Sequence, residues 1–183
     1  MDEKIRQLIF LAQDGNTEMF HELVALHDKR IMILAYQLTQ NTQDAEDLCQ
    51  DVFLKVYRNI KSYKFKSDFY TWIYRITVNT ALNQKRKSSL LPITDIHEYE
   101  NDPHMGWVSD VGDSPVIDIA PDIAIAVNRL PPKQKTVFVL KHFQGQKIRE
   151  IAVILGCSEG TIKRYLFRAM EKLRTSLKDV YYD

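Results

Sequence analysis

Apolar residues recur every three or four positions in two blocks of the chain, and a stretch without this spacing separates the blocks. The spacing is clearest in the run Ala45, Leu48, Cys49, Val52, Phe53, Val56 and Tyr57. It gives a helix one apolar face, and no segment shows the alternation of a β-strand. From Ser88 to Pro121 the spacing fails, and prolines and glycines interrupt acidic sequence. We therefore predict an all-α protein of two small helical bundles, 1–87 and 123–183, joined by a flexible acidic linker, 88–122.

In the first bundle, three further helices are expected after the N-terminal one. The second begins at Thr17 as its N-cap and continues as a single apolar stripe to Leu38. The third carries the run described above, and acidic residues in its first turn favour the helix dipole. The fourth covers about 68–87, with Ser67 or Asp68 as its N-cap.

The second bundle has well-placed start and stop residues. Pro131-Pro132 opens one helix and Gly145 ends it, whereas Gly156 follows a short amphipathic helix and Ser158 caps the last one. The order of a helix, a short helix, a tight turn and a longer basic helix is the plan of a helix-turn-helix, which binds the major groove of DNA.

The net charge of +1 conceals blocks of opposite sign. Segment 61–87 holds seven basic residues against Asp68 alone, no Lys or Arg occurs from Ser88 to Asn128, and the chain is basic again from Arg129. Basic blocks of this kind favour contact with nucleic acid. Affinity for DNA follows the number of phosphates neutralised, so the small overall charge predicts weak DNA binding by the free protein.

The first basic block is rich in aromatic residues: Tyr63, Phe65, Phe69, Tyr70, Trp72 and Tyr74. Rings that stack on unpaired bases contribute about 1–3 kcal/mol per base, which favours single strands over intact duplex. The alternative interpretation is that these rings form core. Tyr70, Arg75 and Asn79 are the better contact candidates, and Phe69 and Trp72 are expected to lie partly in the core.

The last helix carries the residues for duplex recognition. Those that cannot face the core are Glu159, Lys163, Arg164, Phe167 and Arg168. Ser158, Gly160 and Thr161 would offer backbone N–H groups to a phosphate at the helix start. The alternative is a plain amphipathic helix with a solvated basic face.

Several classes of protein are disfavoured. Neither Cys49 nor Cys157 belongs to a Cys-x-x-Cys pair, so we expect reduced thiols, without a disulfide or zinc site. The N-terminus lacks the apolar core of a signal peptide, and no run of about 18 apolar residues exists. We expect a cytoplasmic protein that needs no metal or cofactor and has no membrane span.

Three motifs in this order resemble bacterial RNA polymerase sigma factors of the extracytoplasmic-function group. They are DAEDLCQDVFLKVYRNI, FKSDFYTWIYRITVNTA and LPPKQKTVFVLKHFQGQKIREIAVILGCSEGTIKRYLFRAMEKL. The resemblance covers nearly the whole chain outside the acidic stretch. It implies an alternative sigma factor, not an enzyme, that binds core RNA polymerase, recognises −10 and −35 promoter elements, helps to melt the −10 region and directs transcription initiation.

The resemblance also implies roles for individual residues. The third helix would dock on the polymerase clamp coiled coil through Asp44, Glu46, Asp47, Gln50 and Asp51. The single-stranded −10 element, with one base flipped out, would contact Phe65, Lys66, Ser67, Asp68, Phe69, Tyr70, Trp72, Arg75 and Asn79. The double-stranded −35 element would contact Ser158, Glu159, Gly160, Thr161, Lys163, Arg164, Phe167 and Arg168. The second bundle would also bind the polymerase flap, and an anti-sigma factor is a further expected partner.

Two alternatives stay open at this point. One is a two-domain helix-turn-helix transcription regulator that acts without being a polymerase subunit. The other is an enzyme that uses Asp44, Asp47 and Asp51 as a carboxylate metal site, although the histidines of the chain are scattered. Within the family resemblance, Tyr165 and Met170 stand where Arg is common, which leaves the −35 sequence preference open.

Overall fold

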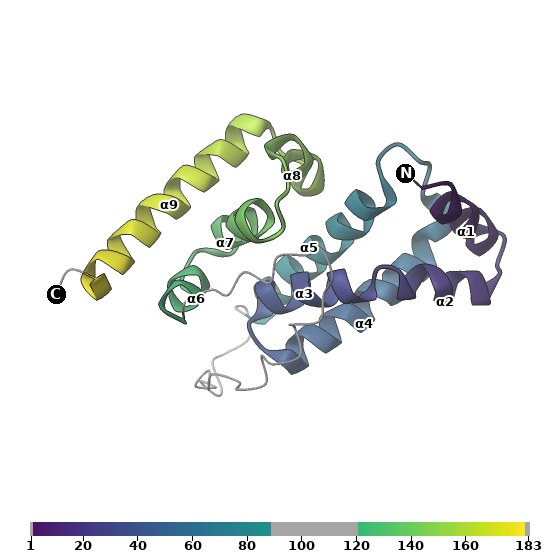
Figure 1. The fold of residues 1–183 in the computed structure, drawn as a ribbon, viewed down its shortest axis with the longest axis horizontal. Coiled ribbons are helices and arrows are strands. Elements are labelled where there is room, and N and C mark those ends of the chain that lie inside the picture. Colours follow the sequence, from purple (N-terminus) through teal and green to yellow (C-terminus); the bar gives the residue numbers. More distant parts are fainter. Residues whose placement is uncertain (1, 89–120, 182–183) are drawn as a thin grey trace. The chain divides into compact units, whose positions relative to one another are not determined.

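The computed structural model describes residues 2–88 and 121–181, and all regular structure among them is helical (Figure 1). The predicted all-α class is therefore confirmed. The chain divides into two compact units, Met1–Ala81 and Leu82–Asp183. The predicted linker falls mainly on residues outside the described ranges. Its far end is corrected, because Pro121 and Asp122 already belong to a helix.

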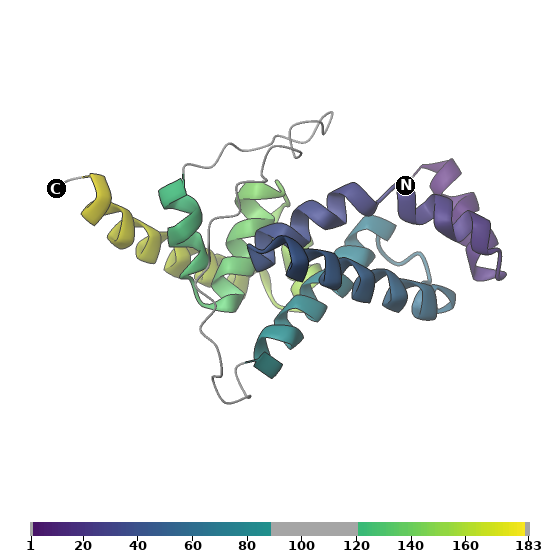
Figure 2. The ribbon, with the colours of Figure 1, turned by 90° about the horizontal axis from the view of Figure 1, so that it is seen from below.

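The first unit holds five helices and a short 3-10 turn: α1 (Glu3–Gln13), α2 (Thr17–Ala25), α3 (Asp28–Thr39), α4 (Thr42–Asn59), the turn Ile60–Ser62, and α5 (Phe69–Ser88), whose last turns extend past the unit's boundary. α1 packs against α2, and α3 packs along α4 (Figures 1 and 2). Asp68 Oδ1 accepts a hydrogen bond from the N–H of Tyr70, which confirms Asp68 as the cap of α5.

The single helix predicted across 17–38 is wrong, because the structure has two helices, α2 and α3, in its place. At the break the N–H of His27 donates to Val24 O, three residues back, at 2.9 Å. The His27 ring is buried, with Nδ1 2.8 Å from Leu23 O and its edge against Phe69. The apolar stripe continues in phase through the break, so periodicity alone does not detect it. The cap of α2 is also corrected from Thr17 to Asn16, whose Oδ1 accepts from the N–H of Met19.

The core of this unit lies where α3 packs on α4. Its members are at most 4% exposed: Ile31, Leu34, Ala35, Leu38, Ala45, Leu48, Val52 and Val56. Full burial of one such Leu, Ile or Val side chain stabilises the fold by about 1.5–3 kcal/mol. This seam fixes the rotation of α4 about its axis, and so decides which side chains of α4 face outward.

The second unit contains α6 (Pro121–Asn128), α7 (Pro132–Phe138), a π-helical turn (Val139–Phe143), α8 (Ile148–Leu155) and α9 (Glu159–Tyr181). α9 packs against α6, α7 and α8. Pro132 starts α7, and Ser158 caps α9 by accepting a hydrogen bond from the N–H of Thr161. The predicted start and stop residues are confirmed here.

Gly156 makes the tight turn between α8 and α9. Its φ of 62° and ψ of 36° lie in the left-handed region, and the N–H of Cys157 donates back to Ala152 O at 3.0 Å. A residue with a Cβ pays about 1–2 kcal/mol in this conformation. The angle between the two helices of the helix-turn-helix therefore depends on glycine at this position.

We predict that Gly156→Ala lowers the free energy of unfolding of the second unit by about 1 kcal/mol, because alanine is strained at positive φ. Urea denaturation followed by circular dichroism measures the change. The matched control is Gly160→Ala in the first turn of α9, where an added Cβ meets only Ser158 Oγ at 3.8 Å. Alanine is the better helix former, so the control is expected to be neutral or stabilising. Equal effects of the two substitutions would contradict the role of the turn.

Candidate nucleic-acid interface

The outward face of α4 is acidic. Asn41 caps the helix by accepting a hydrogen bond from the N–H of Asp44 at 2.9 Å, and the residue before it, Gln40, is left-handed with φ 62°. This start places one carboxylate in the first turn. All five residues expected to bind polymerase are exposed: Asp44, Glu46, Asp47, Gln50 and Asp51. The face is suited to a basic partner surface.

An open apolar groove of about 870 Å³ adjoins this face, between α2, α3 and α4. Its apolar lining includes Phe20, Val24, Met32, Phe53 and Tyr57, and the carboxylates of Asp28 and Glu46 also line it. The sequence predicted Tyr57 as part of the buried stripe, which is wrong, because its side chain is 51% exposed. Periodicity gives the direction of a side chain, and it does not show whether a neighbouring helix covers that side chain.

The loop between α4 and α5 is organised around Tyr63. Its ring is 4% exposed and contacts the rings of Phe65, Phe69 and Trp72, with centroids 4.9–5.3 Å apart. Its hydroxyl donates to Ser67 O at 2.6 Å and so closes the loop. Burial raises the pKa of Tyr63 to about 12, so the hydroxyl keeps the proton that it donates at neutral pH.

The residues expected at the −10 element fall into three groups. Lys66, Asp68, Arg75 and Asn79 are exposed, and Phe65, Ser67, Tyr70 and Trp72 are partly exposed. Phe69 is 1% exposed and packs on His27, Tyr63 and Trp72. We therefore correct Phe69 from a contact residue to a core residue that supports the loop. Phe65 has a φ of 54°, an unfavourable value for a residue with a Cβ.

One basic residue beside this surface was missed. The guanidinium of Arg30, on α3, lies 5.5 Å from the ring centroid of Tyr70. Tyr70 also shares a hydrogen bond with the hydroxyl of buried Tyr74, whose pKa is raised by burial. Arg30 lies far from 61–87 in the sequence, so only the packing of α3 beside α5 brings it near. Sequence spacing gave no signal for it.

α9 presents a cationic and aromatic face. Lys163, Arg164 and Arg168 are exposed, and the ring of Phe167 is 64% exposed. Ile162 and Ala169 on the opposite side are fully buried. One part of the prediction is corrected: the N–H of Thr161 already donates to Ser158 Oγ at 3.2 Å, so it is not offered to a phosphate.

The described ranges offer neither a metal-binding cluster nor a membrane-spanning helix. Residues 2–88 and 121–181 contain no group of three or more His, Cys, Asp or Glu side chains that could hold a metal ion. In the same ranges, no helix combines the length and apolarity needed to cross a membrane. The carboxylates on α4 lie on an open helix face, where they complement a surface better than they surround an ion.

Comparison with known proteins identifies the family of both helical segments. Residues 23–90 match the family model described as Sigma-70 region 2, and residues 123–173 match the model described as Sigma-70, region 4. The SigW ECF RNA polymerase sigma factor of Bacillus subtilis is 28% identical over 98% of this chain and all of that protein. The structure of the sigma factor RpoE from Bartonella quintana, in complex with the anti-sigma factor NepR, matches with a TM-score of 0.63 and 25% identity over 87% of this chain and 96% of that one.

The ECF RNA polymerase sigma-E factor of Escherichia coli K12 is 30% identical over 91% of this chain and 90% of its own length. Two family models in the expected order and a relative aligned along nearly its full length leave little of the chain unmatched. The chain therefore belongs to the extracytoplasmic-function group of RNA polymerase sigma factors, the alternative sigma factors that direct transcription initiation.

Proposed function

We propose that the helical segment up to Ser88 binds core RNA polymerase and the −10 element, that the segment from Pro121 onward binds the −35 element, and that the acidic stretch between them links the two. The observation that carries this proposal is the separation of exposed groups. Carboxylates line one face of α4, aromatic and basic groups surround the closed loop before α5, and cations line α9. Each set complements a different surface: a basic protein face, an unpaired strand and an intact duplex.

At the −10 element, the loop around Tyr63 would receive a flipped base. Stacking on an aromatic side chain contributes about 1–3 kcal/mol per base. Opening a duplex costs about 1.4 kcal/mol per stacking step, so capture of two or three bases offsets a short melt. Partly exposed Trp72 and Tyr70 supply rings, and exposed Lys66 and Arg75 supply charge for the backbone.

At the −35 element, α9 would enter the major groove from its N-terminal end. Lys163, Arg164 and Arg168 would contact guanine edges or phosphates, and Phe167 would contact a thymine methyl group. Ser158 fixes the start of the helix, which sets the angle at which these side chains enter the groove.

The acidic face of α4 would dock on the basic side of the polymerase clamp coiled coil, and the second unit on the flap. The groove beside α4 offers an apolar surface for an anti-sigma factor, the kind of partner found with the Bartonella relative. The protein would act in the cytoplasm as a polymerase subunit and not as an enzyme. A regulator that works without polymerase would have no use for the α4 face.

The first test is runoff transcription with core RNA polymerase on a pool of templates with randomised promoter segments. We expect the chain to start RNA from templates that share two sequence elements. Sequencing of the selected templates identifies both elements. Absence of selected templates, with polymerase shown to be active with another sigma factor, would refute the proposal.

We predict that Asp47→Lys weakens binding to core polymerase about 10-fold, because a cation then faces a basic docking surface. Titration of labelled core measures the dissociation constant. Asp14→Lys, at the exposed C-cap of α1, makes the same charge change outside the acidic face of α4 and is expected to leave the constant within about twofold. Similar losses in both variants would show a general charge effect and no docking face.

We predict that Arg164→Ala reduces initiation from templates with an intact −35 element about 10-fold, because loss of one bidentate guanine contact costs about 1–3 kcal/mol. Initiation from templates that lack the element is expected to change little. Transcript yield from the two template classes gives the ratio. Lys172→Ala removes an exposed cation farther along α9 and serves as control. An unchanged −35 dependence in Arg164→Ala would exclude the contact.

A further inference from the structure

Helix α1 lies outside the segments that match the two sigma-factor family models, yet it is hydrogen-bonded to the loop before α5. Gln13, its last residue, donates from Nε2 to two backbone carbonyls, Ile60 O at 2.8 Å and Tyr63 O at 2.9 Å. These two carbonyls bracket the 3-10 turn that leads from α4 into the loop. One amide group therefore fixes the point at which the loop leaves α4.

A second contact from α1 reaches the tip of the loop. The ring of Phe10 stacks on that of Phe65, with centroids 4.9 Å apart and planes at 30°. The guanidinium of Arg6 lies 6.0 Å from the Phe10 ring and 5.7 Å from the Phe65 ring. Phe65 has the positive φ noted above, a conformation that persists only when neighbouring groups hold it. Phe10 and Tyr63 together provide that support.

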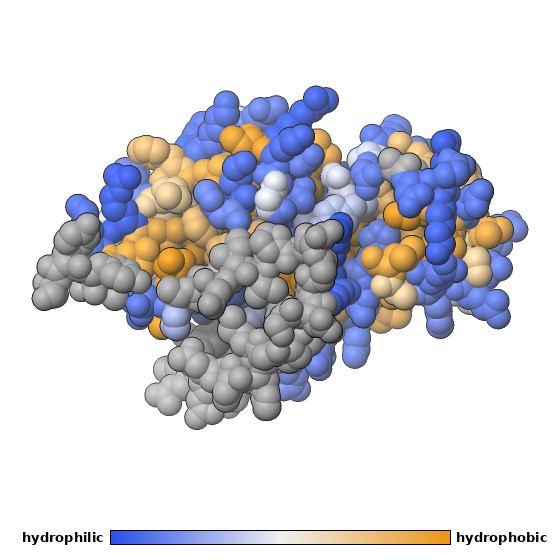
Figure 3. Space-filling view, in the orientation of Figure 1, coloured by the Kyte–Doolittle hydropathy of each residue, from blue (hydrophilic) through white to orange (hydrophobic). Residues whose placement is uncertain are grey.

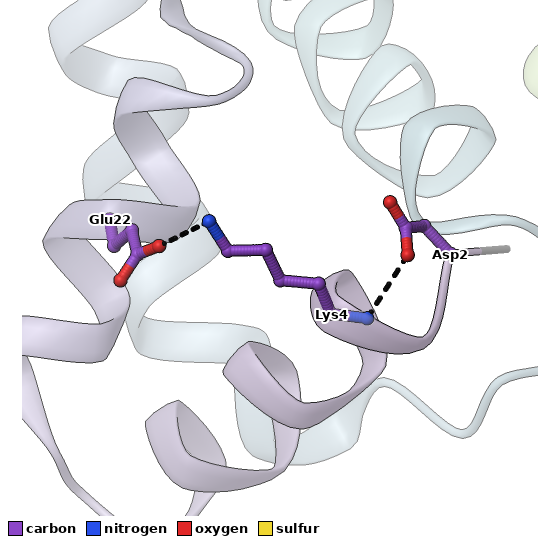
Figure 4. Close-up of polar contacts among 3 residues, drawn as sticks. All are labelled: Asp2, Lys4 and Glu22. Carbon is purple, nitrogen blue, oxygen red and sulfur yellow. Dashed lines mark hydrogen bonds and ion pairs between the residues drawn. The ribbon is translucent and has the colours of Figure 1, made fainter.

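α1 is itself well anchored, so it can act as a brace. Leu8, Ile9 and Ala12 are buried where α1 packs on α2. Lys4 Nζ also lies 2.9 Å from Glu22 Oε1, and the N–H of Lys4 donates to Asp2 Oδ1 at the helix start (Figure 4). Both charged groups of the ion pair are largely exposed, so the apolar contacts provide most of the anchoring.

The outer surface of α1 is not fully hydrophilic. Phe10 is 50% exposed and Leu11 is 46% exposed, and Figure 3 shows hydrophobic residues among hydrophilic ones on the part of the molecule that α1 and α2 occupy. Phe10 is thus a large ring kept at the surface with Phe65 as its partner. Since Phe10 is half exposed and stacks on Phe65, its ring contributes more to the loop conformation than to the core.

We propose that Gln13 and Phe10 are positioning residues for the −10-binding loop, so that α1 holds 63–67 in the conformation that receives a flipped base. The inference rests on the function proposed for this loop. A loop that samples other conformations binds in proportion to its competent fraction, so bracing raises affinity without any new contact to DNA. Gln13 acts through the backbone and not by touching a base.

The test uses Gln13→Met, which keeps the length of the side chain and removes both donors. Full-length variants are combined with core polymerase and the randomised template pool, and selected templates are sequenced. Because Gln13→Met removes two hydrogen bonds, we expect its base preference at one position of the −10 element to fall about 10-fold. Its preference at the −35 element and its affinity for core polymerase are expected to be unchanged. Gln7→Met, on the exposed side of α1, is the matched control and should select the same templates as the wild type.

Phe10→Leu provides a second variant, because it removes the stacking ring from a half-exposed position where loss of folding is not expected. A smaller loss of preference at the same −10 position supports the proposal. An unchanged −10 profile in both variants would overturn it, as would an equal loss at −10 and −35, which indicates poor folding. Failure of the wild-type chain to select any promoter is a separate result and counts against the proposed function itself.

Discussion

The closed loop of the first unit depends on one buried side chain, Tyr63. Its ring packs against both Phe69 and Trp72 at the start of α5, its hydroxyl donates to Ser67 O, and its own carbonyl accepts from Gln13 Nε2. A phenylalanine would fill the same space, but it would leave the loop open at Ser67. Because the ring and hydroxyl act together, α1, the loop and α5 are ordered as one assembly.

The second unit achieves order by local means. A left-handed glycine turns the chain after α8, a serine caps α9, and a proline starts α7, each within a few residues of the element that it controls. Such devices are visible in sequence because they act over one helical turn. This difference explains why the starts of α7 and α9 and the turn after α8 were predicted from the sequence, whereas the π-helical turn that follows α7 was not.

In the first unit, the features that sequence did not reveal are long-range. The break at His27 depends on burial of its ring against Phe69, more than forty positions away. The bracing of the loop by Gln13 spans 47 and 50 positions, and the approach of Arg30 to Tyr70 depends on how α3 packs. Helical spacing and residue propensity are local properties of the sequence, so they do not predict these long-range contacts. The buried faces of α3 and α4 were predictable for the opposite reason, since each follows from its own helical period.

The distribution of charge completes the argument about DNA binding. The chain has 25 Lys and Arg against 24 Asp and Glu, so its cations bring little net attraction for a polyanion. The cations of the loop and of α9 are nevertheless grouped on separate surfaces, and many of the carboxylates lie elsewhere, on α4 among other places. Because the cations are grouped although the chain has almost no net charge, they can orient the protein on DNA without binding the DNA strongly. The protein then depends on a larger partner to hold both surfaces near DNA at once, and the acidic face of α4 is the part of the first unit suited to bind that partner.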